Sequence, residues 1–429
     1  MADRARSDAW RNAIAQLPGR LWSRLVGGSW ALALGRMLLV AMVFGLAALL
    51  FVSAGLVPVA ASQGHWPITR ALLHFAMRRS VQTHALGIKP PPAAEQPFGP
   101  DAMVLKGAGH YAEGCLPCHG APGYPRADVV LHSVPQPPYL PPMVDSWNDR
   151  ELFWIVKHGI KYTAMPAWPS QQRDDEVWAM VAFLRRLPRL EPGQFRRLAY
   201  GEEAGGRATG PTGSAVQTLA NCARCHGRDG AGRGDGAFPP LAGQSEAYLL
   251  ASLRAYGRGD RHSGVMGPVA AALDEGEMRA LAKHYAAAGV PHRHGHAEGD
   301  AAGVVHRAAT AKDAGDARGT SGRPDTSTRA VERGERLARE GAAGRRVASC
   351  VECHGPGPAP RNALYPRLAG QPAAYIELQL SLFQHGTRGG TPYAGIMATV
   401  ADRLQPTDIR DLAAYYASLP AAGGEAAQR

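Results

Sequence analysis

Cysteine is scarce in this sequence, with six residues among 429. Every one of the six belongs to a pentapeptide of the form C-x-x-C-H, so none is left over to build a framework of structural disulfides. A pattern that occurs three times and uses every cysteine is not a chance match. The three copies are Cys115-Leu-Pro-Cys118-His119, Cys222-Ala-Arg-Cys225-His226 and Cys350-Val-Glu-Cys353-His354.

Aromatic residues are also few, at 7%, and 36 acidic residues face 47 basic ones, which gives a net charge of +11. The positive charge is spread along the chain, and residues 1–36 carry six arginines against two acidic residues. No segment combines clustered basic side chains with interleaved aromatic ones, which is the pattern expected of a nucleic-acid binder. We therefore exclude nucleic acid as a partner.

The C-x-x-C-H pattern is the attachment signature of c-type haem. The two thiols add across the two vinyl groups of one porphyrin, and the adjacent histidine becomes a ligand of the iron. A structural zinc site needs four ligands in a tetrahedral array, whereas these pairs lie far apart in the sequence and each has its own histidine. A thioredoxin-like dithiol needs no following histidine. The sequence therefore predicts three covalently bound haem c groups.

Residues 37–61 are predicted to form a membrane anchor. Met37 to Val57 carry no charged side chain, and as a helix they match the ~30 Å hydrocarbon core of a bilayer. Arginines precede this run, so the positive-inside rule predicts a cytoplasmic N-terminus, a single pass through the inner membrane and periplasmic haem domains. The alternative is a signal peptide cleaved near Val59-Ala60-Ala61, although its apolar part would exceed the usual length of about 7–15 residues.

The motifs and the shifts in composition divide the chain into three haem domains joined by linkers. A basic cytoplasmic leader is predicted at 1–36, and a juxtamembrane helix with a proline-rich spacer at 62–98. The later segments are haem domain 1 at 99–198, a linker at 199–213, haem domain 2 at 214–290, a flexible linker at 291–328, haem domain 3 at 329–420 and a tail at 421–429.

The second and third domains are predicted to be repeats of one fold. The stretch from Pro240 to Tyr248 reads Pro-Leu-Ala-Gly-Gln-Ser-Glu-Ala-Tyr, and the stretch from Arg367 to Tyr375 reads Arg-Leu-Ala-Gly-Gln-Pro-Ala-Ala-Tyr. The two stretches begin at nearly the same distance after their motif histidines. Such repetition predicts a duplicated domain, with the two copies packed face to face.

A six-coordinate haem iron needs a second axial ligand opposite the histidine, and a methionine there raises the reduction potential. The third domain decides the choice, because Met397 is its one methionine after the motif and lies 43 residues past His354. Met266 lies 40 residues past His226, and Met165 lies 46 past His119. The predicted axial pairs are His119 with Met165, His226 with Met266, and His354 with Met397.

Other ligands remain possible on the sequence alone. Met143 comes early in the first domain, whereas Met180 and Met278 fall inside predicted closing helices and are better explained as core residues. Ligation by two histidines would give lower potentials than histidine with methionine. The histidines available for it, one in each domain, are His158, His262 and His385.

An aromatic residue follows each predicted axial methionine by 18 or 19 positions. Each falls on the helix that is expected to close its domain and to pack against the opening helix behind the haem. The residues are Phe183, Tyr285, and the pair Tyr415 and Tyr416. The closing helix of the second domain is further predicted to begin with a cap at Asp274-Glu-Gly-Glu277.

These features together resemble a known family. Each domain is similar to a class I cytochrome c, with an opening helix, C-x-x-C-H, loops, a distal methionine and a closing helix. The second and third domains, through their Leu-Ala-Gly-Gln segments, resemble the two-haem periplasmic cytochromes c that serve terminal oxidases. The first domain, through Trp154 to Trp168, resembles the single-haem domains of respiratory oxidases and quinone-linked dehydrogenases. The resemblance implies an all-α fold of three class I domains after one N-terminal transmembrane helix.

The function expected from this resemblance is electron transfer rather than substrate chemistry, because iron held by histidine and methionine has no open coordination position. The expected partners are a terminal oxidase, a quinol-oxidising complex or a dehydrogenase. The main alternative is a cytochrome subunit of a membrane-bound alcohol or sugar dehydrogenase. A haem peroxidase would need a five-coordinate iron, and a sensor would need a signalling domain that the cytoplasmic leader does not provide.

Overall fold

The computed structural model describes residues 30–57, 59–92, 96–201, 215–233, 236–288, 327–356 and 362–421. The described chain forms two compact units, Met1–His65 and Trp66–Arg429. Most of the predicted leader, the predicted linker at 291–328 except its last two residues, and the predicted tail after residue 421 lie outside the described residues.

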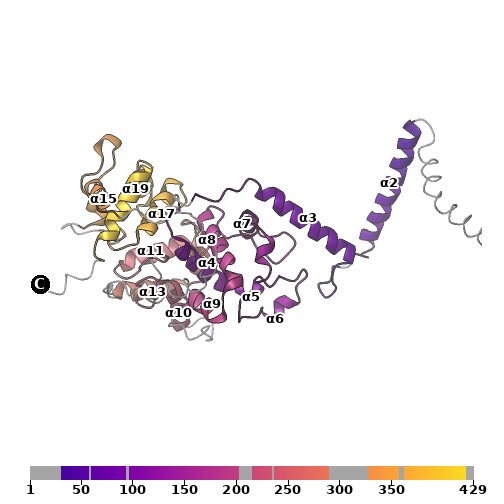
Figure 1. The fold of residues 1–429 in the computed structure, drawn as a ribbon, viewed down its shortest axis with the longest axis horizontal. Helices are drawn as coiled ribbons and strands as arrows, with labels where there is room; N and C mark the ends of the chain where they lie inside the picture. The colour runs from indigo at the N-terminus through magenta and orange to yellow at the C-terminus, as the bar shows by residue number, and fades with distance from the viewer. Residues whose placement is uncertain are drawn as a thin grey trace, which may run out of the picture. The chain divides into compact units, whose positions relative to one another are not determined.

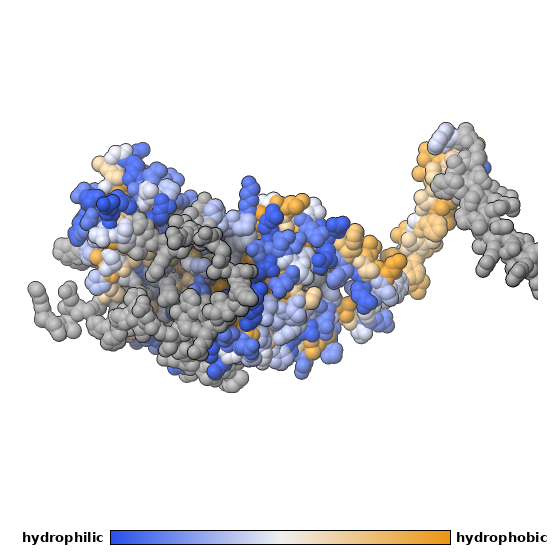
Figure 2. All heavy atoms as spheres, in the orientation of Figure 1, coloured by the Kyte–Doolittle hydropathy of each residue, from blue (hydrophilic) through white to orange (hydrophobic). Residues whose placement is uncertain are grey.

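The first unit contains the helix α2, Trp30–Ser53. Its segment Leu32–Ser53 is long and apolar enough to cross a membrane, with a mean hydropathy of 2.3 and none of that window buried. Figure 2 shows its side chains as a nearly continuous apolar surface. The helix begins before the predicted anchor and includes Arg36, and it ends at Ser53, four residues before the end of the uncharged run.

The second unit is helical throughout its described residues, and no strand occurs among them beyond isolated bridges. This confirms the predicted all-α fold.

Three groups of helices follow α3, Pro67–Ala85 (Figure 1). Module one contains α4 Pro100–Gly114, α5 Leu116–His119, α6 Asp128–Leu131, α7 Asp149–His158, α8 Asp174–Arg186 and α9 Pro192–Tyr200. Module two contains α10 Ala215–His226, α11 Glu246–Gly257, α12 Met266–Ala271 and α13 Glu275–Ala287. Module three contains α15 Thr328–Glu340, α16 Val351–His354, α17 Ala373–Gln384, α18 Ala394–Ala401 and α19 Pro406–Ser418. Short 3₁₀ turns lie at Val144–Ser146, Leu187–Arg189 and Ala343–Arg345.

Opening and closing helices cross at a glycine in modules one and three. A Cβ on Gly107 of α4 would lie 2.4 Å from the carbonyl oxygen of Ala179 on α8. A Cβ on Gly334 of α15 would lie 2.0 Å from the carbonyl oxygen of Asp411 on α19. Because real Cβ atoms do not approach so closely, only glycine lets these helices pack at this separation.

The predicted aromatic residues lie on the closing helices and are buried. Phe183 is fully buried and its ring centroid lies 5.0 Å from that of Tyr111 on the opening helix α4. Tyr285 on α13 is buried, as are Tyr415 and Tyr416 on α19. The closing helix of module two also begins as expected, because the Asp274 side chain accepts from the Glu277 N–H and the Glu277 side chain accepts from the Asp274 N–H.

Module one ends with a helix that the sequence analysis did not predict. Helix α9 includes the first two residues of the predicted linker at 199–213. Its Phe195 is fully buried and packs edge-on against Tyr111 and Tyr124. The core of module one therefore extends to Tyr200, whose side chain is buried in the same cluster.

Helix α3 has one end packed on module one and one end exposed. Val81 and Ala85 near its C-terminus are buried, and the helix contacts α7. Ile68, Leu72 and Phe75 in its first half are exposed. This distribution leaves an apolar face on the half of the helix that follows the predicted membrane anchor.

Modules two and three contact each other through the repeated segment. Gln244 Nε2 donates to the Arg367 carbonyl at 2.8 Å, and the equivalent Gln371 Nε2 donates to the Pro240 carbonyl at 2.9 Å. The Arg367 N–H also donates to Gln244 Oε1 at 2.9 Å. Pro240 has no N–H to return, and Gln371 Oε1 has no partner in the described part of the chain. The contact is thus two-fold symmetric except for one hydrogen bond that proline removes.

A second reciprocal contact lies beside the first. Arg388 donates to the Tyr248 hydroxyl at 3.1 Å, and the equivalent Arg261 donates to the Tyr375 hydroxyl at 3.3 Å. The backbones of the two arginines form an antiparallel bridge. The two repeats therefore pack face to face, as the repetition in the sequence predicts.

Candidate haem sites

The three C-x-x-C-H motifs end in the same local structure. In each, the histidine is the last residue of a helix: α5 ends at His119, α10 at His226 and α16 at His354. A glycine with positive φ follows each histidine and ends the helix: Gly120, Gly227 and Gly355. The repeated motif is thus six residues long, C-x-x-C-H-G, and its glycine is a signal in the sequence that the predictions did not use.

Each motif histidine is oriented by a proline carbonyl. The Nδ1 atoms lie 3.0 Å from the Pro138 carbonyl, 3.1 Å from Pro239 and 2.9 Å from Pro366, in the order of the modules. Because a carbonyl only accepts, Nδ1 must carry the proton, which is the tautomer of a histidine that binds a metal through Nε2. Burial lowers the pKa of His119 and of His226, which favours the neutral ring that binds a metal.

The cysteines are partly buried thiols that form no disulfide with one another. Burial raises the pKa of Cys115 and Cys222 to about 12, and that of Cys225 and Cys350 to about 11. Among the described residues, no group of three or more His, Cys, Asp or Glu side chains is placed to hold a metal ion.

The predicted residues of module three surround one cavity of about 140 Å³. Its lining includes both cysteines and the histidine of the motif together with Met397, and the rest is mostly apolar. His385 is not one of the described residues that line this cavity. Its Nδ1 instead hydrogen-bonds the Ser381 carbonyl at 2.7 Å, on the surface. Two thiols, an imidazole whose Nδ1 donates to the Pro366 carbonyl and an apolar chamber suit a covalently attached haem.

The other two predicted methionines lie on different local structures. Met165 lies in a loop, where its N–H donates to Thr163 Oγ1 at 3.1 Å and its carbonyl accepts from the Ile160 N–H at 3.2 Å. Met266 is the first residue of α12, and its N–H donates to Ser263 Oγ at 3.0 Å. Both side chains are half-buried. Met397 lies within α18.

The alternative methionines lie in the core or on the surface. Met180 and Met278 are buried on α8 and α13, where we expected core residues. Met143 is 45% exposed.

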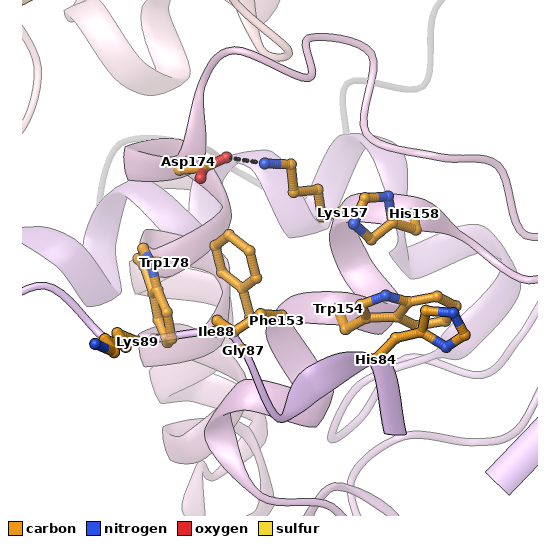
Figure 3. A pocket seen from close by; sticks show the side chains of 10 residues that line it. All are labelled: His84, Gly87, Ile88, Lys89, Phe153, Trp154, Lys157, His158, Asp174 and Trp178. Carbon is orange, nitrogen blue, oxygen red and sulfur yellow. Dashed lines mark hydrogen bonds and ion pairs between the residues drawn. The ribbon is translucent and has the colours of Figure 1, made fainter. Parts of the chain in front are cut away.

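His158 lies in a separate cavity of about 380 Å³ with His84 and Trp154 (Figure 3). The two imidazole centroids are 5.2 and 5.5 Å from the Trp154 ring. No motif cysteine lines this cavity among the described residues.

Comparison with protein families agrees with these sites. The family described as cytochrome C oxidase, cbb3-type, subunit III matches residues 102–184, and the cytochrome c family matches residues 212–285 and 331–420. The chain belongs to the c-type cytochromes. Each matched segment contains one motif of this cytochrome, and such domains carry covalently bound haem c.

Curated relatives of this cytochrome align with about half of it. The thiosulfate dehydrogenase electron acceptor of Thiomonas intermedia is 32% identical over 48% of this chain and 82% of its own. Cytochrome c4 of Azotobacter vinelandii is 31% identical over 49% of this chain and 90% of its own. The cytochrome c subunit of the quinone-type alcohol dehydrogenase of Gluconacetobacter polyoxogenes is 25% identical over 42% of this chain and 43% of its own.

Proposed function

We propose that this cytochrome is a membrane-anchored, periplasmic tri-haem electron carrier of a respiratory chain that delivers electrons to a terminal oxidase. The observation that carries the proposal is the threefold repetition of one site, in which each motif histidine ends a helix before a glycine of positive φ and donates from Nδ1 to a proline carbonyl. When bound, each haem supplies an iron that exchanges one electron. The haem domains are those at 99–198, extended to Tyr200, and at 214–290 and 329–420.

The proposed ligand set pairs each histidine with a methionine: His119 with Met165, His226 with Met266, and His354 with Met397. The covalent links are those of Cys115, Cys118, Cys222, Cys225, Cys350 and Cys353. The cavity of module three supports the set, because Met397 and His354 line it together whereas His385 does not. Methionine ligands raise the potential and leave no open position, which suits a carrier.

The three modules adjoin one another near their motifs, which suits transfer between haems. A Cβ on Gly109 of α4 would lie 3.2 Å from Cys225 Sγ, so the opening helix of module one approaches the motif of module two. Pro239, whose carbonyl accepts from His226, also lines the cavity of module three. The opening helix of module one therefore approaches the motif of module two, and module two contributes to the cavity of module three, which gives an electron a short path along the chain.

The number of haems tests this proposal. We expect the mature chain to gain the mass of three haems, and a double variant Cys350→Ala and Cys353→Ala to gain two, as measured by mass spectrometry of the denatured protein. Denaturation releases any haem that is not covalently bound, whereas thioether bonds survive it. The mass therefore counts only the covalently attached haems. A colourless protein, made in cells that attach haem to other chains, would refute the function.

We further propose that α2 is retained as an anchor and that the exposed apolar half of α3 lies on the membrane surface. The full-length chain should then stay with the membrane after alkaline carbonate washing and dissolve only in detergent. A soluble periplasmic form beginning near residue 62, identified by its N-terminal sequence, would instead show that the segment is a cleaved signal peptide.

The alternative function is a cytochrome subunit of a membrane-bound alcohol or sugar dehydrogenase. It is supported by the similarity to the alcohol dehydrogenase subunit of Gluconacetobacter polyoxogenes. The thiosulfate dehydrogenase electron acceptor, which aligns over more of its length, supports a carrier that receives electrons from a separate dehydrogenase. Detergent extraction of native membranes distinguishes the two functions. A quinoprotein or flavoprotein that co-purifies with this cytochrome in a fixed ratio would favour the dehydrogenase subunit. A terminal oxidase that co-purifies with it would favour the electron carrier.

A further inference from the structure

A buried carboxylate lies where module one meets module two. Glu176 on α8 is 6% exposed, and both of its oxygens have partners. Oε1 accepts from Ser263 Oγ at 2.6 Å and lies 3.0 Å from an Arg173 guanidinium nitrogen. Oε2 accepts from the Gly264 N–H at 2.7 Å and from Trp168 Nε1 at 3.2 Å. Its partners thus come from two segments nearly a hundred residues apart in the chain.

The first segment is the loop of one proposed axial methionine. Trp168 follows Met165 by three residues, and its backbone N–H donates to the Lys157 carbonyl at 2.9 Å. Its side chain is buried in the core of module one. The bond from its indole N–H to Glu176 therefore fixes the end of the Met165 loop to the closing helix.

The second segment is the loop of another proposed axial methionine. Ser263 Oγ donates to Glu176 and accepts from the Met266 N–H at 3.0 Å, so one hydroxyl joins the carboxylate to the methionine backbone. A Cβ on Gly264 would lie 2.1 Å from Trp168 Nε1. The two loops therefore touch each other at the position where both bond the carboxylate.

Arg173 is an ion-pair partner that Glu176 shares with the neighbouring carboxylate of Asp175. Its guanidinium forms two bonds of 2.7 Å to the Asp175 carboxylate and one of 2.8 Å to the His262 carbonyl, in addition to its contact with Glu176. A buried carboxylate without such a partner would be costly to ionise. The arginine also holds the Met266 loop directly, through the residue before Ser263.

We propose that Glu176 is a positioning residue shared by two haem sites, which holds the Met165 loop and the Met266 loop against each other. Glu176 itself binds neither iron. It sets how firmly each methionine sulfur is held toward its haem, so that a change at one interface residue alters the first and second sites together and leaves the third unchanged. The proposal rests on the ligand set proposed above.

The direction of the effect separates positioning from charge. Methionine ligation raises the potential, so loosening both loops lowers the potentials of the first and second haems. Removing a negative charge without moving the loops favours the electron-rich reduced state and raises them. Glu176→Gln keeps the shape of the side chain, removes the charge and leaves only one oxygen for the four donors.

We expect Glu176→Gln in the full-length holoprotein to lower two of the three potentials by at least about 59 mV, the equivalent of a tenfold change in a one-electron equilibrium. Potentiometric titration measures the potentials. Proton NMR of the reduced protein resolves the sites, because the ring current of each haem shifts the methyl signal of its bound methionine. Glu275→Gln is the matched control, since Glu275 also pairs with an arginine, Arg254, but lies on the surface of module two.

Two further variants each cut one side of the contact and serve if Glu176→Gln does not fold. Ser263→Ala should lower the potential of the second haem alone, and Trp168→Phe that of the first alone. Potentials that stay unchanged or rise in all three variants overturn the proposal. If the wild-type protein shows three haems but fewer than three shifted methionine methyl signals, the ligand set proposed above is wrong, which is a different result.

Discussion

Replacing Met397 by alanine should open one of the three irons to carbon monoxide, which the wild-type protein should not bind. The methionine lines the same cavity as His354, and alanine is too short to reach an iron from the same position. One equivalent of carbon monoxide should bind per reduced chain. The potential of that haem should also fall by a sizeable part of the roughly 0.8 V range that axial ligands span.

The matched control for Met397→Ala is His385→Ala, which removes the alternative ligand of the same module. Because His385 is exposed and is not among the described residues that line the cavity of His354 and Met397, we expect this variant to bind no carbon monoxide and to keep all three potentials. Optical titration with the gas measures both variants under the same conditions. The opposite pattern, with the iron opened only by His385→Ala, would establish ligation by two histidines.

The parts of the structure that the sequence predicts are those that a side-chain pattern specifies locally. The motifs, the closing helices with their buried aromatic residues and the capping box at Asp274 all depend on spacing within one short segment. The face-to-face packing of modules two and three was predictable because a repeat tends to pack against its own copy. Helix α9 could have been predicted too, since Glu191 and Gln194 form a capping box ahead of an apolar face, and we overlooked it.

Other parts could not be predicted, because they depend on contacts between distant segments. The acceptors for the three motif histidines are backbone carbonyls, which every residue possesses, so these hydrogen bonds are not visible in the side-chain pattern. What the sequence does show is that Pro239 and Pro366 directly precede the two repeated stretches. Glu176 reads as one of several acidic residues at the start of a helix, where such residues are common. Only the packing of module two on module one shows that its carboxylate is buried and bonds two methionine loops.

Replacing Gly334 by alanine should destabilise module three, although alanine favours a helix. In a helix interior alanine gains about 1 kcal/mol over glycine. At this crossing, however, the new Cβ would lie 2.0 Å from the Asp411 carbonyl oxygen and 2.9 Å from Tyr415 Cβ. Overpacking of this kind costs about 1–3 kcal/mol and sometimes more, and the backbone of α19 cannot yield as a flexible side chain would. Because the clash is with backbone, we expect the upper end of that cost, which after the helix gain leaves a net loss of roughly 1–2 kcal/mol in the free energy of unfolding.

Gly344→Ala provides the control for Gly334→Ala, because it lies in the same module and no described atom comes within 4 Å of the position that its new Cβ would take. Thermal unfolding followed by the haem absorbance of module three should give a clearly lower midpoint for Gly334→Ala and little change for Gly344→Ala. Gly107→Ala should behave like Gly334→Ala in module one, since its Cβ would lie 2.5 Å from Phe183 Cβ. A Gly334→Ala protein as stable as the wild type would show that α15 and α19 are farther apart than described, and that the buried tyrosines rather than the glycine set their separation.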